Sequence, residues 1–180
     1  AIIPDSQAAI SAGIGMVFQH FKLVENFSVL ENVILGAEDG PLLKQSLAKA
    51  RVQLTNLSKE YELDVDPDAI IENMSVGLQQ RVEILKALYR EANILILDEP
   101  TAALDVSVQA VVLNLLQELK CELDMSYLFI SHDLNVVRLL CDRVMVMQSG
   151  RILEEGETGK VYDKKLDFEI KSNLFDAKIL

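Results

Sequence analysis

The sequence lacks the features by which membrane-spanning and secreted chains are recognised. None of its apolar runs approaches the roughly 18 residues that cross a bilayer. Its first five residues, AIIPD, lack the basic region and apolar core of a secretory signal. We therefore expect a chain that neither spans a membrane nor is secreted. Because residue 1 is Ala rather than Met, the sequence is compatible with processing or with a fragment of a longer chain.

Cysteine is also scarce. The two cysteines, Cys121 and Cys141, have neither C-x-x-C spacing nor a His-rich neighbourhood. A cysteine-based metal site or a disulfide framework is therefore not expected. Two thiols that are compatible with a protein core fit a reducing cytoplasm.

Basic residues are outnumbered, with 17 Lys and Arg against 28 Asp and Glu and a formal net charge of −11. A nucleic-acid surface needs a basic footprint, so nucleic acid is not expected as a partner. Local anion binding stays open, because helix N-termini and metal-bridged phosphates do not require a basic protein. Half of the residues are hydrophobic, which is the composition of a globular domain with a sizeable core.

The clearest feature that is present is a short apolar run ending in two acids. Residues 94–97, ILIL, are too few for a typical helix and predict a strand buried on both faces. Asp98 and Glu99 follow, and Pro100 cannot continue the ladder. Unpaired buried carboxylates are costly, so the two acids must meet water, a cation or a polar ligand. In open parallel sheets, ligands bind at this carboxyl end of the strands.

The apolar spacing predicts an α/β fold with helices on the faces of a parallel sheet. The strands are expected at residues 16–18, 94–97, 127–130, 143–148 and 151–155. Residues 37–90 have a nearly continuous helical pattern and predict a helical subdomain inserted after the first strand. A terminal helix is expected around Phe168, Ile170, Leu174 and Phe175.

Polar residues follow three of the predicted strands: Gln19 the first, Asp98 and Glu99 the second, and His132 the third. Parallel strands present the same end to one edge of a sheet, so these groups are expected to converge. An amide, two carboxylates and an imidazole suit a magnesium-assisted attack of water on a phosphoryl group. Taken singly, each of them is also compatible with an ordinary polar residue at a strand end.

Two further positions are predicted helix starts. Ser75 and Asp105 each precede apolar residues at helical spacing and are good N-cap candidates. Gly77 would leave backbone amides uncovered in the first turn, where anions are attracted. Without other evidence, such a cap is more often only a cap.

Together these residues resemble the ATP-binding subunit of ABC transporters, over nearly all of residues 13–160. The resemblance implies an α/β, P-loop NTPase-like fold, with a parallel sheet flanked by helices and an inserted helical subdomain. Five motifs occur in the family's order: Gln19 matches the Q-loop, 74–78 (MSVGL) the signature motif, 94–99 the Walker B strand with its adjoining acid, 102–105 the D-loop and His132 the H-loop.

The resemblance also implies roles for these residues. Glu99 would polarise the attacking water and His132 would contact the terminal phosphate, which makes both catalytic. Asp98 and Gln19 would help to hold Mg²⁺, and Gln19 would link the nucleotide to a membrane partner. The residues implied to contact ATP are Gln19, Ser75, Gly77, Asp98 and Asp105, with Ser75 and Gly77 reaching the ATP of the opposite subunit.

The implied partners are transmembrane permease subunits and a second ATPase subunit, identical or different. The implied location is cytoplasmic and peripheral, on the inner face of the cell membrane. Residues 14–100 look most like ATPases of simple-sugar or nucleoside importers, whereas residues 101–157 look more like those of dipeptide and oligopeptide importers. A recombinant, designed, misassembled or divergent sequence would explain the two likenesses.

The sequence departs from the family in two places. The signature LSGGQ is here MSVGL, which keeps Ser75 and Gly77 but has Leu78 in place of Gln. No segment matches G-x-x-x-x-G-K-[ST], because the only Gly-Lys pair, Gly159-Lys160, is followed by Val. The resemblance therefore implies a single ABC ATPase domain without its N-terminal lobe. Its expected parts are a core remnant at 1–19, a helical subdomain with the Q-loop exit and signature helix at 20–92, a Walker B to H-loop core at 93–160, and a tail at 161–180.

Two functions remain open from the sequence. The first is the ATP-hydrolysing subunit of an ABC-type importer. The second is a truncated, non-catalytic remnant or interaction module that cannot bind ATP by itself, because phosphate-cradling amides and a lysine are not found. A relative of DNA-repair or SMC proteins is disfavoured, since the 55 residues between Gln19 and Ser75 are too few for a long coiled coil.

Overall fold

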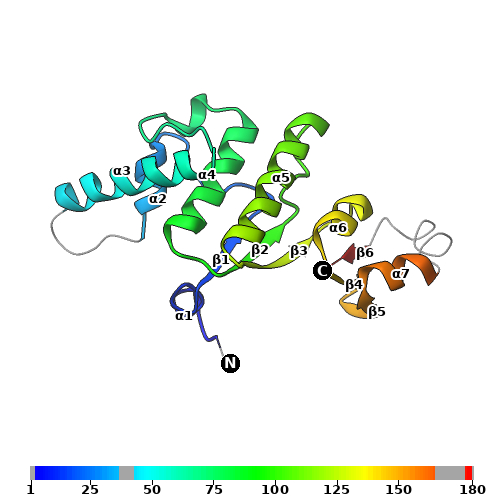
Figure 1. The fold of residues 1–180 in the computed structure, drawn as a ribbon. Helices are drawn as coiled ribbons and strands as arrows, with labels where there is room; N and C mark the ends of the chain where they lie inside the picture. The colour runs from blue at the N-terminus through cyan, green and yellow to red at the C-terminus, as the bar shows by residue number, and fades with distance from the viewer. Residues whose placement is uncertain (1–2, 37–42, 165–176, 180) are drawn as a thin grey trace.

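A parallel sheet of three strands lies in the middle of the computed structural model, which describes residues 3–36, 43–164 and 177–179 (Figure 1). The strands lie in the order β1-β2-β3. Val17 is paired with Leu97, and Leu97 with Phe129, so the three strands end at the same edge. Their bounds are Ile14–Val17 for β1, Ile94–Asp98 for β2 and Ser126–Ile130 for β3.

Helices dominate the chain between β1 and β2, as the sequence predicts. Ser28 starts the first of them with a capping box, in which its hydroxyl accepts from the Glu31 amide and the Glu31 carboxylate accepts from the Ser28 amide. Helices α2, α3 and α4 pack on one another. The helical elements up to β2 are α1 (Ser6–Ser11), α2 (Val29–Ile34), α3 (Leu43–Glu60), the 3₁₀ helix η1 (Ile71–Asn73) and α4 (Val76–Tyr89).

Close packing fixes α4 against the sheet. A side chain on Gly15 of β1 would place its Cβ 3.2 Å from the Ala87 Cβ of α4 and 2.9 Å from Leu95. Glycine, which has no side chain, therefore allows α4 to pack this closely on β1. On the neighbouring strands, α5 (Val106–Glu122) covers the same face, and the Tyr127 hydroxyl donates to the Leu116 carbonyl at 2.8 Å.

The core lies between this face and the helices, and the opposite face is only partly covered. Leu95 and Leu97 of β2 are fully buried, whereas Ile94 is 39% exposed. Met16 and Leu128 on the flanking strands are exposed as well. The prediction of a strand buried on both faces is therefore wrong for the described residues, because α4 and α5 both pack on the same side.

A second sheet follows α6 (Leu134–Leu140) and corrects another prediction. The strand at 143–148 has the predicted bounds but lies outside the parallel sheet, pairing antiparallel on both sides. The turn at Ser149 and Gly150, with φ of 50° and 76°, explains the direction, because so short a connection joins antiparallel strands. The elements are β4 (Arg143–Gln148), β5 (Arg151–Glu157), α7 (Thr158–Lys164) and β6 (Ala177–Ile179).

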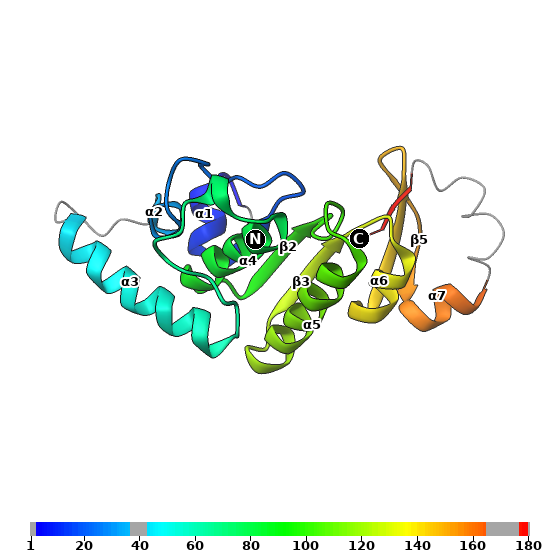
Figure 2. The ribbon, with the colours of Figure 1, turned by 90° about the horizontal axis from the view of Figure 1, so that it is seen from above.

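The helical region around α3 lies at one end of the molecule and the β4–β5 hairpin with α7 at the other, with the parallel sheet between them (Figure 2). The predicted terminal helix at 168–175 falls outside the described residues. Among the helices that are described, none is long and apolar enough to cross a bilayer.

Candidate functional site

The chain turns sharply where β2 ends at the sheet edge. Glu99 has φ of +48°, a left-handed conformation that costs a non-glycine residue about 1–3 kcal/mol. Its amide donates to the Ile130 carbonyl of β3 at 2.9 Å, which holds the turn against the neighbouring strand. The residue is 8% exposed, so its carboxylate sits in a mostly enclosed position and needs polar partners.

Those partners come from the segment that follows β3. His132 Nδ1 lies 2.8 Å from Glu99 Oε1, and the Ser131 hydroxyl lies 3.4 Å from Oε2. The His132 side chain is 64% exposed, so its opposite ring nitrogen remains available to a ligand. The predicted convergence of the second and third strand ends is thus present as a carboxylate–imidazole pair from residues 33 positions apart.

Asp98, the last residue of β2, is paired in register with Ile130 and is half-buried at the same edge. No group of three or more His, Cys, Asp and Glu side chains that could hold a metal ion occurs in the part of the chain that the structure describes. Mg²⁺ does not require one, because it is commonly held by one or two carboxylates, phosphate oxygens and water. The donor chemistry of Asp98 therefore fits a Mg²⁺ that arrives with a nucleotide.

Gln19 follows the end of β1, at the edge where the three parallel strands end. β1 ends at Val17, opposite Leu97, so Gln19 follows two residues beyond the strand instead of ending it. Its proposed contacts with ATP and Mg²⁺ stay predictions.

Two more of the predicted site residues, Ser75 and Asp105, lie at the N-termini of α4 and α5. Both are N-caps, as the sequence predicts: Ser75 accepts from the Leu78 amide at 3.4 Å and Asp105 from the Ser107 and Val108 amides at 3.0 Å. The Ser107 hydroxyl, which donates to Asp105, and the Val108 and Ser107 amides hold the pKa of Asp105 below its usual value.

Gly77 joins these two starts. A Cβ on Gly77 would lie 2.6 Å from Val108 Cγ1, so the missing side chain lets α4 and α5 approach each other. Besides the uncovered amides that the sequence predicts at Gly77, the structure shows that Val108 fills the space where a side chain would be. Predicted nucleotide contacts at Ser75, Gly77 and Asp105 therefore sit on one packed unit.

Sequence reasoning missed two polar contacts around Glu99. The Ser131 hydroxyl bonds both Glu99 and the Asp133 amide, which lies 3.1 Å away. Thr101, buried after the Glu99 turn, accepts from Gln109 of α5 at 3.4 Å and so connects the edge to that helix. In the sequence, these two contacts are indicated only by a Ser or Thr that follows a predicted strand.

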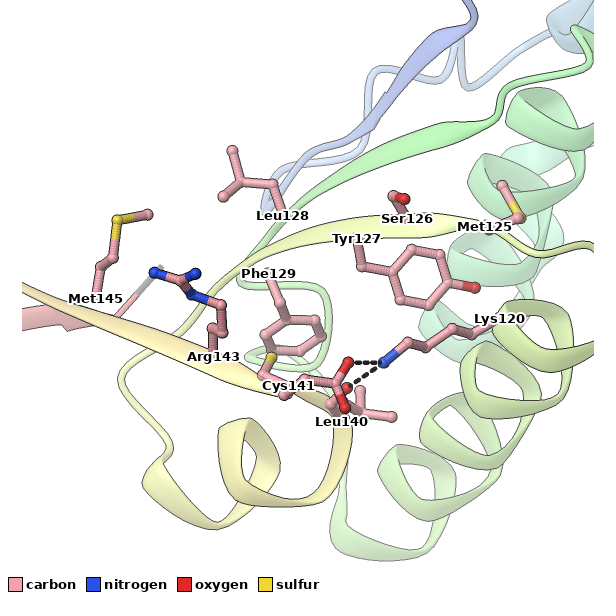
Figure 3. A pocket seen from close by; sticks show the side chains of 11 residues that line it. Lys120, Met125, Ser126, Tyr127, Leu128, Phe129, Leu140, Cys141, Arg143 and Met145 are labelled. Carbon is pink, nitrogen blue, oxygen red and sulfur yellow. Dashed lines mark hydrogen bonds and ion pairs between the residues drawn. The ribbon is translucent and has the colours of Figure 1, made fainter. Parts of the chain in front are cut away.

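A cavity of about 480 Å³ opens elsewhere, between β3 and the start of β4 (Figure 3). A Lys120–Asp142 ion pair at 2.7 Å lies beside it. Burial raises the pKa of the Cys141 thiol, which disfavours the reactive thiolate. None of the predicted site residues lines this cavity, so it does not locate the chemistry.

Comparisons with solved structures show that the α/β fold is that of an ATP-binding cassette. The cbiO1 structure from Clostridium perfringens, part of the ABC transporter complex cbiONQ, superposes with a TM-score of 0.72 at 29% identity, over 95% of this chain and 70% of that one. A dimeric structure of the bacterial ABC transporter cassette MJ0796 gives a TM-score of 0.68 at 28% identity, over 86% and 67%.

The sequence comparisons extend this to the family. The model described as ABC transporter matches residues 2–102, and the chain belongs to that family. A nucleoside import ATP-binding protein of Lactococcus lactis is 42% identical over 168 residues. The match covers 91% of this chain but only 32% of the relative.

Proposed function

We propose that the chain is the ATP-hydrolysing part of an ABC-type importer. The observation that carries the proposal is the Glu99–His132 pair at the carboxyl edge of the parallel sheet, 2.8 Å apart. The family membership and the name of the relative from Lactococcus lactis support it. The same findings do not favour the alternative of a non-catalytic remnant.

In the proposed reaction, a water molecule attacks the terminal phosphorus of ATP. The water passes a proton to the Glu99 carboxylate, and the bond between that phosphorus and the bridging oxygen breaks, with ADP keeping the electron pair. His132, held through Nδ1 by Glu99, presents its other ring nitrogen to the terminal phosphate. The left-handed turn at Glu99 fixes the carboxylate before substrate arrives.

Mg²⁺, when bound with the nucleotide, would neutralise charge on the phosphate oxygens. Asp98 supplies a carboxylate at the edge of the sheet for this ion, and Gln19 a neutral amide oxygen. Ser75, Gly77 and Asp105 are proposed to contact the ATP of a second ATPase subunit. The dimeric MJ0796 cassette and the packed α4 and α5 starts support that arrangement.

The proposed membrane partners are transmembrane permease subunits, which would place the chain on the inner face of the cell membrane. The cbiONQ complex named for the similar structure supports an assembly of this kind. Among cargo classes, we favour nucleosides or simple sugars, because the nucleoside importer relative matches 91% of this chain. The likeness of residues 101–157 to other importers predicts dipeptides or oligopeptides as the alternative cargo.

The test is phosphate release from Mg-ATP by the complete gene product that contains these residues. We expect turnover, and a loss of about 10²–10⁴-fold in the Glu99→Gln variant, the range of a general base. Glu118→Gln, an exposed acid on α5, is the matched control and should retain parental turnover. A Glu99→Gln variant as active as this control would refute the proposed role.

The 180 residues alone should bind ATP weakly, because they contain no G-x-x-x-x-G-K-[ST] segment to cradle the phosphates. Calorimetric titration of the 180-residue chain with Mg-ATP measures this directly. Micromolar affinity would show that the described edge suffices for nucleotide binding.

A further inference from the structure

A buried carboxylate on α4 has partners outside its own helix. Glu83 is 1% exposed, and its Oε1 accepts from the Lys22 amide at 2.8 Å, 61 residues away in the sequence. Lys86, one turn along α4, places its ammonium 3.4 Å from Glu83 Oε2 and 3.4 Å from the Lys22 carbonyl. Both backbone groups of Lys22 are thus held by one ion pair.

The segment that is held follows Gln19 directly. Residues 18–24 form neither helix nor strand, so no backbone ladder fixes their position. A second buried side chain, Asn32 of α2, at 3% exposure, accepts from the Val24 amide at 2.7 Å and donates to the Val24 carbonyl at 3.0 Å. Two polar side chains on two helices therefore fix alternate residues of the loop.

Stability alone is a weak reason for such a pair. A buried ion pair contributes little relative to well-packed apolar residues, because removing two charges from water is costly. Its specific effect is geometric, because within the described residues the backbone groups that the charge pair bonds are those of Lys22. α4 is also the helix that Ser75 caps and that Gly77 packs against α5.

We propose that Glu83, assisted by Lys86, is a positioning residue for Gln19. It ties the loop three residues beyond Gln19 to α4, so that Gln19 and the Ser75 end of α4 move as one unit. The loop contact stands on the structure alone, whereas its effect on turnover rests on the proposed ATPase function.

The contact is tested by amide hydrogen exchange of the folded chain. In Glu83→Gln, exchange at Lys22 should accelerate about tenfold, because the neutral amide oxygen of Gln accepts the Lys22 N–H more weakly than the carboxylate does. Val24, held by Asn32, should change little, and Glu118→Gln should leave both amides as in the parent. Unchanged exchange at Lys22 in Glu83→Gln would overturn the proposal.

If Glu83→Gln does not fold, Lys86→Met provides the second variant, because it removes the ammonium and keeps the carboxylate. It should also accelerate exchange at Lys22, by a smaller factor. Parental exchange at Lys22 in Lys86→Met would count against the role of the ion pair.

A double-mutant cycle that combines Glu83→Gln with Gln19→Ala distinguishes the positioning role from a general loss of stability. In the complete gene product, Glu83→Gln should raise the Mg²⁺ concentration for half-maximal turnover. In a Gln19→Ala background, the same substitution should change turnover by less than about twofold. Effects that multiply would show that Glu83 acts elsewhere. If the parent shows no turnover, the proposed ATPase function fails, and exchange at Lys22 decides whether Glu83 holds the loop beyond Gln19.

Discussion

The sheet edge and the paired starts of α4 and α5 differ in what their polar side chains bond. At the edge, Glu99 and His132 bond each other across two strand ends. At the helix starts, Ser75 and Asp105 bond amides within three residues of themselves. The first arrangement is tertiary and orders a reactive group. The second is local, and its proposed ligand must be brought by another subunit.

The largest effect should come from breaking the edge pair. His132→Ala should lower ATP turnover by about 10²–10³-fold, the usual cost of one preorganised donor to developing charge. Its free energy of unfolding should fall by about 1–3 kcal/mol, because the mostly enclosed Glu99 carboxylate loses its 2.8 Å partner. Phosphate release and urea unfolding measure the two quantities. Ser131→Ala, which removes a longer contact to the same carboxylate, should lose less turnover than His132→Ala.

A smaller effect, on stability, should come from filling the contact between the helix starts. Gly77→Ala should cost about 1–3 kcal/mol of unfolding free energy, because its Cβ overlaps Val108. Helix propensity alone predicts the opposite sign, a gain of about 1 kcal/mol. Urea unfolding distinguishes the two. Adding Val108→Ala should cost less than the sum of the single changes, and strictly additive costs would contradict the packing explanation.

The smallest effect should be the pH dependence of the Asp105 cap. The folded-state pKa of Asp105 is lowered, chiefly by the Ser107 hydroxyl, so its contribution is fully present above the usual pKa of 3.8. The contribution is lost as the pH falls through the lower folded-state pKa. Parent and Asp105→Asn should therefore differ most in urea midpoint near neutral pH and converge in acid. A constant difference down to acidic pH would exclude ionisation of the cap.

Much of the fold could be predicted because its signals are local. Ser75 and Asp105 mark helix starts through short-range capping, and the apolar run at 94–97 marks β2. The antiparallel second sheet was not predicted, because the alternation of strands and helices was taken to indicate a parallel sheet for residues 143–155 as well. The Ser149-Gly150 turn carried the correct signal.

The site could be predicted only in part. Glu99 and His132 both follow strand ends, and parallel strands end at the same edge of a sheet. Their proximity could therefore be predicted. The left-handed turn at Glu99, the Ser131 contact and the burial of Glu83 could not, because these depend on packing between distant segments. The burial of β2 on one face only could not be predicted either, because the sequence ILIL does not indicate which face the helices cover.

The central claim is that Glu99 and His132 act as one catalytic unit, and a double-mutant cycle on turnover tests it most directly. Phosphate release would be measured for the parent, Glu99→Gln, His132→Ala and the double variant of the complete gene product. The geometry predicts that the double variant is about as slow as Glu99→Gln alone, because residues that act together are not additive. Losses that multiply across the two positions would contradict the account.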